Sequence, residues 1–267
     1  MEIPLFPLHT VLCPGIVLPL HIFEERYRAM TRHCLDSGEP FGVVLIRGGR
    51  EAGRRPVATL AGVGAFAEIR EAGRYPDGRY DLLAAATGRF AIESVDAQRE
   101  PYLVAQVTPL DDEVGDEPRA ERLAATAIRR FVRYLDLMRA RDGETAEVLD
   151  IRVEVETMGD DDDEDASLAV DADTPFGPPQ PEVTIASNEP PTRHDLVIPD
   201  DPTVLSYLLS GIVQVELPRR QALLEADTTV ERLEGLIALL ERELVLLRRR
   251  LRYFTPDPRL AGGSRRS

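Results

Sequence analysis

Four prolines within the first 20 residues restrict what this chain can fold into more than any other feature. They are Pro4, Pro7, Pro14 and Pro19. Two apolar runs, residues 3–12 and 16–22, flank a Pro14-Gly15 turn, and residues 24–34 then have a helical pattern. Proline lacks a backbone N–H donor, so both runs must lie at a sheet edge, a kink or a bulge. The stretch therefore predicts a small, sharply curved barrel or half-barrel and excludes a flat sheet.

Short apolar runs continue as far as about residue 112, and turn residues separate them. Pro76-Asp77-Gly78 is a strong turn signal, because proline fixes one backbone angle and glycine tolerates the other. Gly62 and Gly64 suit a bent strand. A dinucleotide-binding loop is the alternative, but the third glycine and the helix of such a site do not follow them. The predicted strands cover residues 41–46, 57–69, 80–85, 90–95 and 102–110. Six or seven strands with one early helix predict an α+β fold.

The second half of the chain has helical periodicity. Residues 118–141 carry apolar side chains at three-to-four spacing. Asp201 followed by Pro202 is typical of a helix start, and a short helix is predicted at 218–226. Residues 228–254 form the longest helix, with apolar residues alternating at spacings of three and four. Its apolar stripe is wider than a two-stranded seam, which favours a helical bundle within the chain over pairing with a second copy.

Between these helices lies a segment that is predicted to be a disordered linker, residues 156–198. Residues 154–173 contain ten acidic residues and no basic ones. The net charge of the whole chain is −15, so the rest of the chain carries a net charge of only −5. Few large apolar residues accompany them, so burial cannot offset the ordering entropy. The alternative, a calcium loop at Asp160–Asp165, conflicts with the alternate ligand spacing of such loops. The predicted division is 1–112 β-barrel, 113–155 helical connection, 156–198 linker, 199–256 helical domain and 257–267 tail.

Three blocks of the sequence resemble the Lon substrate-binding domain, the N-terminal domain of Lon proteases, and they occur in family order. The first is IPLFPLHTVLCPGIVLPLHIFEERYRAM, where Cys13 replaces a usual aromatic residue. The second is GVGAFAEIREAGRYPDGRYDLLAAATGRFAIESV, similar to the family's hairpin. The third begins at Asp201 and continues into the long helix. The resemblance implies a PUA-like, Lon N-terminal type of β-barrel and a function in binding polypeptides.

The resemblance also implies recognition without chemistry. The sequence contains no Gly-x-x-x-x-Gly-Lys-Ser/Thr motif, and it contains no lysine for the Ser–Lys pair of Lon peptidases. We therefore expect a free-standing, non-enzymatic member of the family that lacks the ATPase and peptidase domains and uses no cofactor. The expected partners are unfolded or exposed polypeptide segments, together with a separate protease or ATPase. The contacting residues are unknown at this level.

A few residues carry alternative chemistry. His9 and His21 flank the Pro-Gly turn near Cys13 and Glu24, so a zinc site is conceivable, although no HxxxH or CxxC spacing occurs. A Cys–His nucleophile would use Cys13 or Cys34. Buried reduced thiols and barrel-lining histidines are the simpler interpretation. The other two histidines are His33 and His194.

Charge and hydropathy restrict the partners and the location. Arg248–Arg250, Arg252 and the tail pair Arg265-Arg266 form the main basic cluster, typical of a helix C-terminus but also able to meet an acidic partner or Asp160–Asp165. The mild net charge outside the linker argues against nucleic acid as the main ligand. Without a long apolar run or a signal-like start, a cytoplasmic location is expected. The alternative function is a structural or regulatory module that forms a homodimer through residues 228–254.

Overall fold

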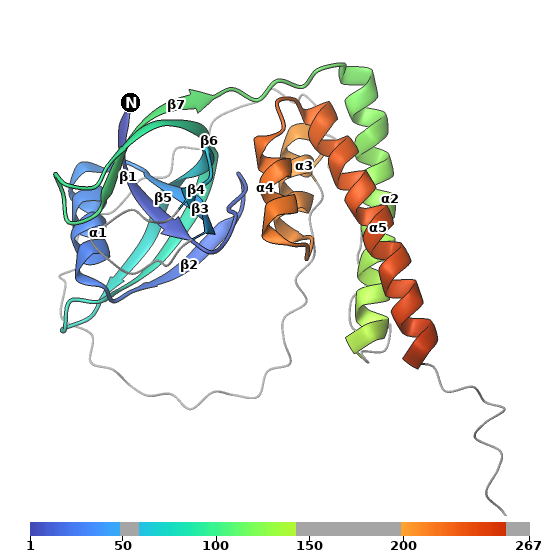
Figure 1. Cartoon of the computed structure of the whole chain (residues 1–267), viewed down its shortest axis with the longest axis horizontal. Coiled ribbons are helices and arrows are strands. Elements are labelled where there is room, and N and C mark those ends of the chain that lie inside the picture. Colours follow the sequence, from blue (N-terminus) through green and yellow to red (C-terminus); the bar gives the residue numbers. More distant parts are fainter. Residues whose placement is uncertain (49–58, 143–198, 255–267) are drawn as a thin grey trace, which may run out of the picture.

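The computed structural model describes residues 1–48, 59–142 and 199–254, arranged as a strand-rich part and a helical part (Figure 1). The strands are β1 (Glu2–Leu8), β2 (Val17–Ile22), β3 (Phe41–Gly48), β4 (Thr59–Leu60), β5 (Val63–Arg74), β6 (Tyr80–Asp96) and β7 (Leu103–Leu110). The helices are α1 (Glu25–Ser37), α2 (Glu117–Asp142), α3 (Pro202–Ile212), α4 (Leu217–Glu225) and α5 (Thr229–Phe254). Strands and helices thus follow each other in the order that the sequence predicts.

Five strands form a closed circuit of pairings. The order is β1-β7-β6-β5-β3, and β1 pairs with β3 in parallel as well as with β7 in antiparallel orientation. The short β4 continues the sheet beside β3, and β2 lies off the circuit against the first half of β6. The strand-rich part is therefore strongly curved, as the prolines require.

The prolines lie where one side of their strand has no partner among the described residues. Pro4 is in the half of β1 that pairs only with β7, and Pro7 is in the half that pairs only with β3. Pro19 is in β2, which pairs only with β6. A missing N–H costs nothing on an unpaired side, so the expectation of edge positions is confirmed for these three residues.

Two glycines allow β3 and β5 to approach the ring of Phe90, which is fully buried. A Cβ at Gly42 would lie 2.6 Å from Phe90 Cζ, and a Cβ at Gly64 would lie 2.5 Å from the same atom. A Cβ at Gly64 would also lie 2.6 Å from the carbonyl oxygen of Val43, which cannot move independently. Close packing therefore explains Gly64, whereas a Cβ at Gly62 would meet no described atom within 4 Å.

Helix α1 covers the strand-rich part with its buried face. Tyr27, Met30 and Cys34 belong to one apolar cluster with Phe6, whose ring centroid lies 4.4 Å from that of Tyr27. The helix ends at Gly38, whose left-handed backbone (φ 72°) turns the chain toward β3. The sheet and α1 thus share a core.

Helices α2, α3 and α5 share a second apolar cluster. Leu233, Leu240, Leu244 and Leu247 of the heptad pattern are buried in it. Asp201 caps α3 by accepting hydrogen bonds from the N–H groups of Thr203 and Val204 (2.6 and 3.1 Å). The described seam of α5 is thus used inside the chain, while the neighbouring Val245 and Leu246 are exposed.

Two strand boundaries differ from the sequence prediction. Residues 80–85 and 90–95 belong to one strand, β6, because its first half pairs with β2 and its second half with β7. A single register shift between Phe66 and Ala67, which pair with Gly88 and Ala86, absorbs the irregularity at Thr87-Gly88. Residues 57–69, predicted as one strand, divide into β4 and β5. The predicted linker at 156–198, the alternative calcium loop and the tail at 257–267 lie outside the described residues.

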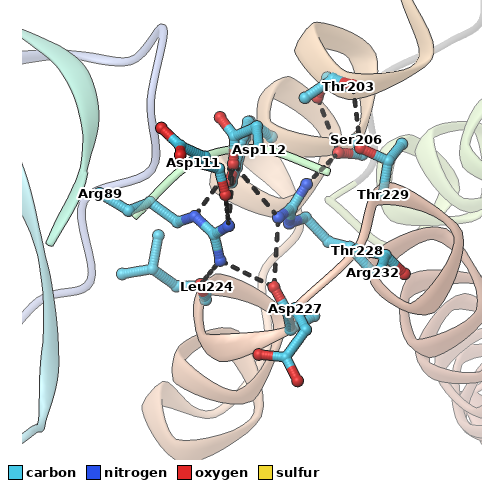
Figure 2. A network of polar contacts seen from close by, with 12 residues as sticks. Arg89, Asp111, Asp112, Thr203, Ser206, Leu224, Asp227, Thr228, Thr229 and Arg232 are labelled. Carbon is cyan, nitrogen blue, oxygen red and sulfur yellow. Dashed lines mark hydrogen bonds and ion pairs between the residues drawn. The ribbon is translucent and has the colours of Figure 1, made fainter. Parts of the chain in front are cut away.

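Two buried arginines connect the strand-rich part to the helices (Figure 2). Arg89 of β6 donates hydrogen bonds to the carbonyl oxygens of Leu224 (2.9 Å) and Ala226 (2.7 Å) and forms an ion pair with Asp112 (2.9 Å). Arg232 of α5 lies over the ring of Tyr207 (3.8 Å) and 3.8 Å from the Asp112 carboxylate. Two guanidinium groups thus share one carboxylate at this junction.

Candidate functional site

The residues proposed for metal binding or nucleophilic catalysis lie in different environments. His9 and His33 are exposed, and His21 lies on β2 with its Nδ1 2.6 Å from an Asp81 oxygen. Cys13 and Cys34 are buried in two different apolar clusters. Within residues 1–48, 59–142 and 199–254, no group of three or more His, Cys, Asp or Glu side chains is arranged to hold a metal ion. His194 lies outside the described residues.

We expect both cysteine thiols to resist alkylation in the folded protein. Burial raises the pKa of Cys13 to about 11 and that of Cys34 to about 12, so almost no thiolate exists at pH 8. Iodoacetamide at pH 8 should therefore label neither residue until urea unfolds the chain, and mass spectrometry measures the labelling. Rapid labelling of folded protein at Cys13 would instead support the Cys–His nucleophile.

One face of the strand-rich part exposes apolar and aromatic side chains around β2. Val17, Pro19 and His21 alternate along β2 with side chains that point toward the core, and all three are exposed. Val17 is 49% exposed and Phe23, immediately after the strand, is 63% exposed. Exposed apolar side chains that gather in one place mark interaction sites, so this surface is the first candidate for partner contact.

The hairpin between β5 and β6 adds an aromatic and charged cluster next to β2. Its Tyr75 ring lies 6.2 Å from the His21 ring, which in turn stacks 6.3 Å from Phe23. Tyr75 donates its hydroxyl hydrogen bond to Asp81, which also pairs with His21. The guanidinium of Arg79 lies 5.4 Å from the centre of the Tyr75 ring. We call Val17, Pro19, His21, Phe23 and Tyr75 the β2 surface.

Hydrogen bonds within the hairpin shift the pKa values of its ionisable side chains. The hydroxyl of Tyr75 and then the ring of His21 donate hydrogen bonds to Asp81 and lower the pKa of its carboxyl group. The same contact with Asp81 raises the pKa of the Tyr75 hydroxyl. Asp77, in the turn, has a lowered pKa because the backbone N–H of Arg79 donates to it. At neutral pH the cluster therefore presents ionised carboxylates and a protonated phenol.

The hairpin is held in place by its turn and by α1. Gly78 has a left-handed backbone (φ 84°) and its N–H donates to the carbonyl oxygen of Tyr75 (2.9 Å), as the Pro76-Asp77-Gly78 signal predicts. The side chain of Arg28 on α1 lies so close that a Cβ at Gly78 would meet it at 2.0 Å. The turn residues thus fix Tyr75 and Asp81 beside β2.

A groove of about 440 Å³ lies between the α3–α4 connection and α5. Leu217, Leu246, Arg220 and Arg242 are among its lining residues. Glu216 and Glu243 also line it, and Arg242 contacts Glu243 at 3.3 Å. Its charges are therefore largely paired, which makes it a weaker candidate than the β2 surface.

Sequence reasoning named no contacting residue, and the β2 surface shows why. His21 was singled out as a metal or catalytic candidate, but it forms part of an exposed aromatic cluster. Phe23 and Tyr75 stand 52 positions apart in the sequence, in two different blocks of the family resemblance, and nothing local indicates that they lie near each other. Alternation in β2 was the available signal, because Val17, Pro19 and His21 fall on one face of a strand with period two. Arg248 and Arg249 are exposed on α5, and the rest of that basic cluster lacks a described side chain.

None of the described helices is long and apolar enough to cross a membrane.

A family model described as the ATP-dependent protease La (LON) substrate-binding domain matches residues 2–242. The Lon protease of Cytophaga hutchinsonii is 23% identical over 92% of this chain and 24% of its own length. The Lon protease of Escherichia coli K12 is 25% identical over 92% of this chain and 25% of its own length. The chain thus spans about a quarter of the length of these relatives.

Solved structures have the same fold. A Lon N-terminal domain protein from Xanthomonas campestris superposes with a TM-score of 0.50, at 21% identity, and covers 89% of this chain and 98% of its own. The N-terminal domain of a Mycobacterium avium complex Lon protease gives a TM-score of 0.51 at 17% identity, covering 90% of this chain and 98% of its own. At these identities the match speaks for the fold, and the family model covers most of the sequence. The chain therefore belongs to the family of the ATP-dependent protease La (LON) substrate-binding domain.

Proposed function

We propose that this chain recognises polypeptides without acting on their covalent bonds, and that the β2 surface makes the contact. The observation that carries the proposal is Phe23, which is 63% exposed and lies beside the His21 ring, as the Tyr75 ring also does. Exposed aromatic residues beside a few charges suit unfolded segments, whose apolar side chains lack a core of their own. Family membership supports the same class of ligand.

The proposal extends to the division of the chain into domains. We infer that residues 1–112 act as a small barrel and that the helices of 113–155 and 199–256 act as a bundle. The closed circuit of five strands and the shared core of α2, α3 and α5 support this division. A separate protease or ATPase would receive the bound segment in a cytoplasmic setting. Dimerisation through α5 is not proposed, because Leu233, Leu240 and Leu244 face the interior.

We expect Phe23→Ser to weaken polypeptide binding at least about tenfold. Burying a phenylalanine side chain contributes roughly 2 kcal/mol, and 1.4 kcal/mol corresponds to a factor of ten. The probe is fluorescein-labelled ribonuclease, reduced and carboxymethylated so that it stays unfolded, and fluorescence anisotropy measures its affinity.

Val245→Ser is the matched control, because Val245 is 47% exposed on α5, away from the β2 surface. It should bind the probe as the unchanged protein does. Equal weakening by both substitutions, or none by Phe23→Ser, would exclude the β2 surface as the binding site. A probe that does not bind the unchanged protein would contradict polypeptide recognition itself.

A further inference from the structure

Within residues 1–48, 59–142 and 199–254, the backbone of β2 has one side paired and one side open. The N–H of Ala86 donates to the carbonyl oxygen of Ile16 (3.0 Å), and the antiparallel register continues from Val17↔Ala85 to Ile22↔Tyr80. Hydrogen-bonded and non-hydrogen-bonded positions alternate in such a pair. Leu18, Leu20 and Ile22 therefore exchange hydrogen bonds with β6. The N–H and C=O groups of the intervening residues point away from β6.

The open side carries five backbone hydrogen-bonding groups. Val17 and His21 each present an N–H and a C=O, while Pro19 presents a C=O alone. The position of Pro19 agrees with this assignment, because proline is tolerated where no ladder N–H is needed. Among the described strands only β6 pairs with β2, so no strand of the described chain uses these groups.

A comparison with the other open edge nearby indicates that β2 is adapted to a partner. The second half of β5, beyond Ala67, also lacks a second partner strand among the described residues. That edge carries Arg70, Glu71 and Arg74, the kind of charged residues that keep sheet edges from pairing. The β2 edge carries Val17 and Pro19 and is followed directly by Phe23, with no Lys, Arg, Asp or Glu between residues 16 and 23.

We propose that β2 accepts an extended polypeptide segment as an additional strand, which rests on the proposed function and gives it a mechanism. The hydrogen-bonding groups of Val17, Pro19 and His21 repeat about every 7 Å along the edge. Another extended backbone presents donors and acceptors at this repeat, which selects a strand as the occupant. Backbone pairing recognises the extended conformation of the bound segment, and its contribution to affinity does not depend on the sequence of that segment. Phe23 and Tyr75 then favour segments that carry apolar side chains next to the paired stretch.

The test replaces the two outward donors with proline. We expect Val17→Pro and His21→Pro each to weaken binding about fivefold, because each removes one hydrogen bond and leaves a carbonyl oxygen of the bound segment unpaired. The probe is a fluorescein-labelled peptide of alternating valine and serine with an arginine at each end. The fivefold loss is measured against Val17→Ala and His21→Ala, since these variants also remove the side chain from the β2 surface but keep the N–H group. Circular dichroism and thermal unfolding verify the fold of every variant.

A second measurement changes the peptide and leaves the protein intact. N-methylation of every second residue removes the N–H groups of one face of the peptide backbone. Backbone pairing is independent of the sequence, so the peptide can turn its unmethylated edge to β2. Strand addition therefore requires that methylation of every second residue, in either phase, leaves binding and that methylation of every residue abolishes it. Equal affinities for the peptides methylated at every second residue and at every residue would overturn the proposal.

The results separate this inference from the proposed function. If Phe23→Ser weakens binding of the unfolded ribonuclease and neither proline substitution weakens peptide binding, strand addition is overturned and polypeptide recognition stands. If the unchanged protein binds neither probe, both are overturned. Light scattering tests whether a second copy of this chain pairs with β2 instead. A concentration-dependent dimer that His21→Pro abolishes would assign the β2 edge to self-association and overturn the proposal.

Discussion

Asp112→Ala is expected to lower the free energy of unfolding by about 3 kcal/mol, because Asp112 supplies the carboxylate shared by the two buried arginines of the junction. The side chains of Arg89 and Arg232 are only 2% and 0% exposed. After the substitution the two guanidinium groups would remain buried with carbonyl oxygens and the Ser206 hydroxyl as partners, and they would lose their shared carboxylate. The hydroxyl of Tyr207 would also lose its acceptor. The effect stays below the upper range for buried ion pairs because Asp112 is 32% exposed.

Chemical denaturation measures this change, and Asp111→Ala is its matched control. Asp111 contributes its carbonyl oxygen to Arg89 (3.2 Å), and alanine keeps that oxygen. The control should change the free energy of unfolding by less than about 0.5 kcal/mol. Similar losses of unfolding free energy in both variants would show that negative charge near the junction stabilises it, and that the carboxylate shared by the two arginines has no special role.

Gly64→Ala is expected to destabilise the strand-rich part by about 3 kcal/mol. The new Cβ would lie 2.5 Å from Phe90 Cζ and 2.6 Å from the carbonyl oxygen of Val43. The ring of Phe90 is fully buried, and the oxygen belongs to a paired strand, so neither can move without disturbing the core. Thermal unfolding should show a correspondingly lower midpoint.

Gly62→Ala separates crowding from backbone freedom. Gly62 lies just before β5 and Gly64 is the second residue of that strand, but a Cβ at Gly62 would have no described neighbour within 4 Å. We expect Gly62→Ala to change stability by less than about 1 kcal/mol in either direction. If the two substitutions destabilised the protein equally, loss of glycine flexibility would explain the result better than the contact with Phe90.

The candidate site was much less predictable than the fold. The exposed faces of β2 and of the β5–β6 hairpin meet because β6 pairs with both β2 and β5, and pairing partners that far apart leave no local pattern. His21 was recognisable as a chemical group, but its partner Asp81 is 60 positions away. The buried junction had no signal either, since arginines are common in this chain and its acceptors are mostly backbone carbonyls.

The sequence by itself determined the local elements and the family. Prolines in the first strands, the Pro76-Asp77-Gly78 turn, the Asp201 cap and the heptad pattern of α5 act through backbone angles, missing donors and side-chain periodicity, which are properties of neighbouring residues. Only the tertiary structure decided which strand edges remain open and which side chains remain exposed. The circuit of β1, β3, β5, β6 and β7 leaves β2 with a single partner among the described strands, and the junction at Asp112 joins strands to helices. Burial and pairing depend on residues distant in the chain, so no local pattern could predict them.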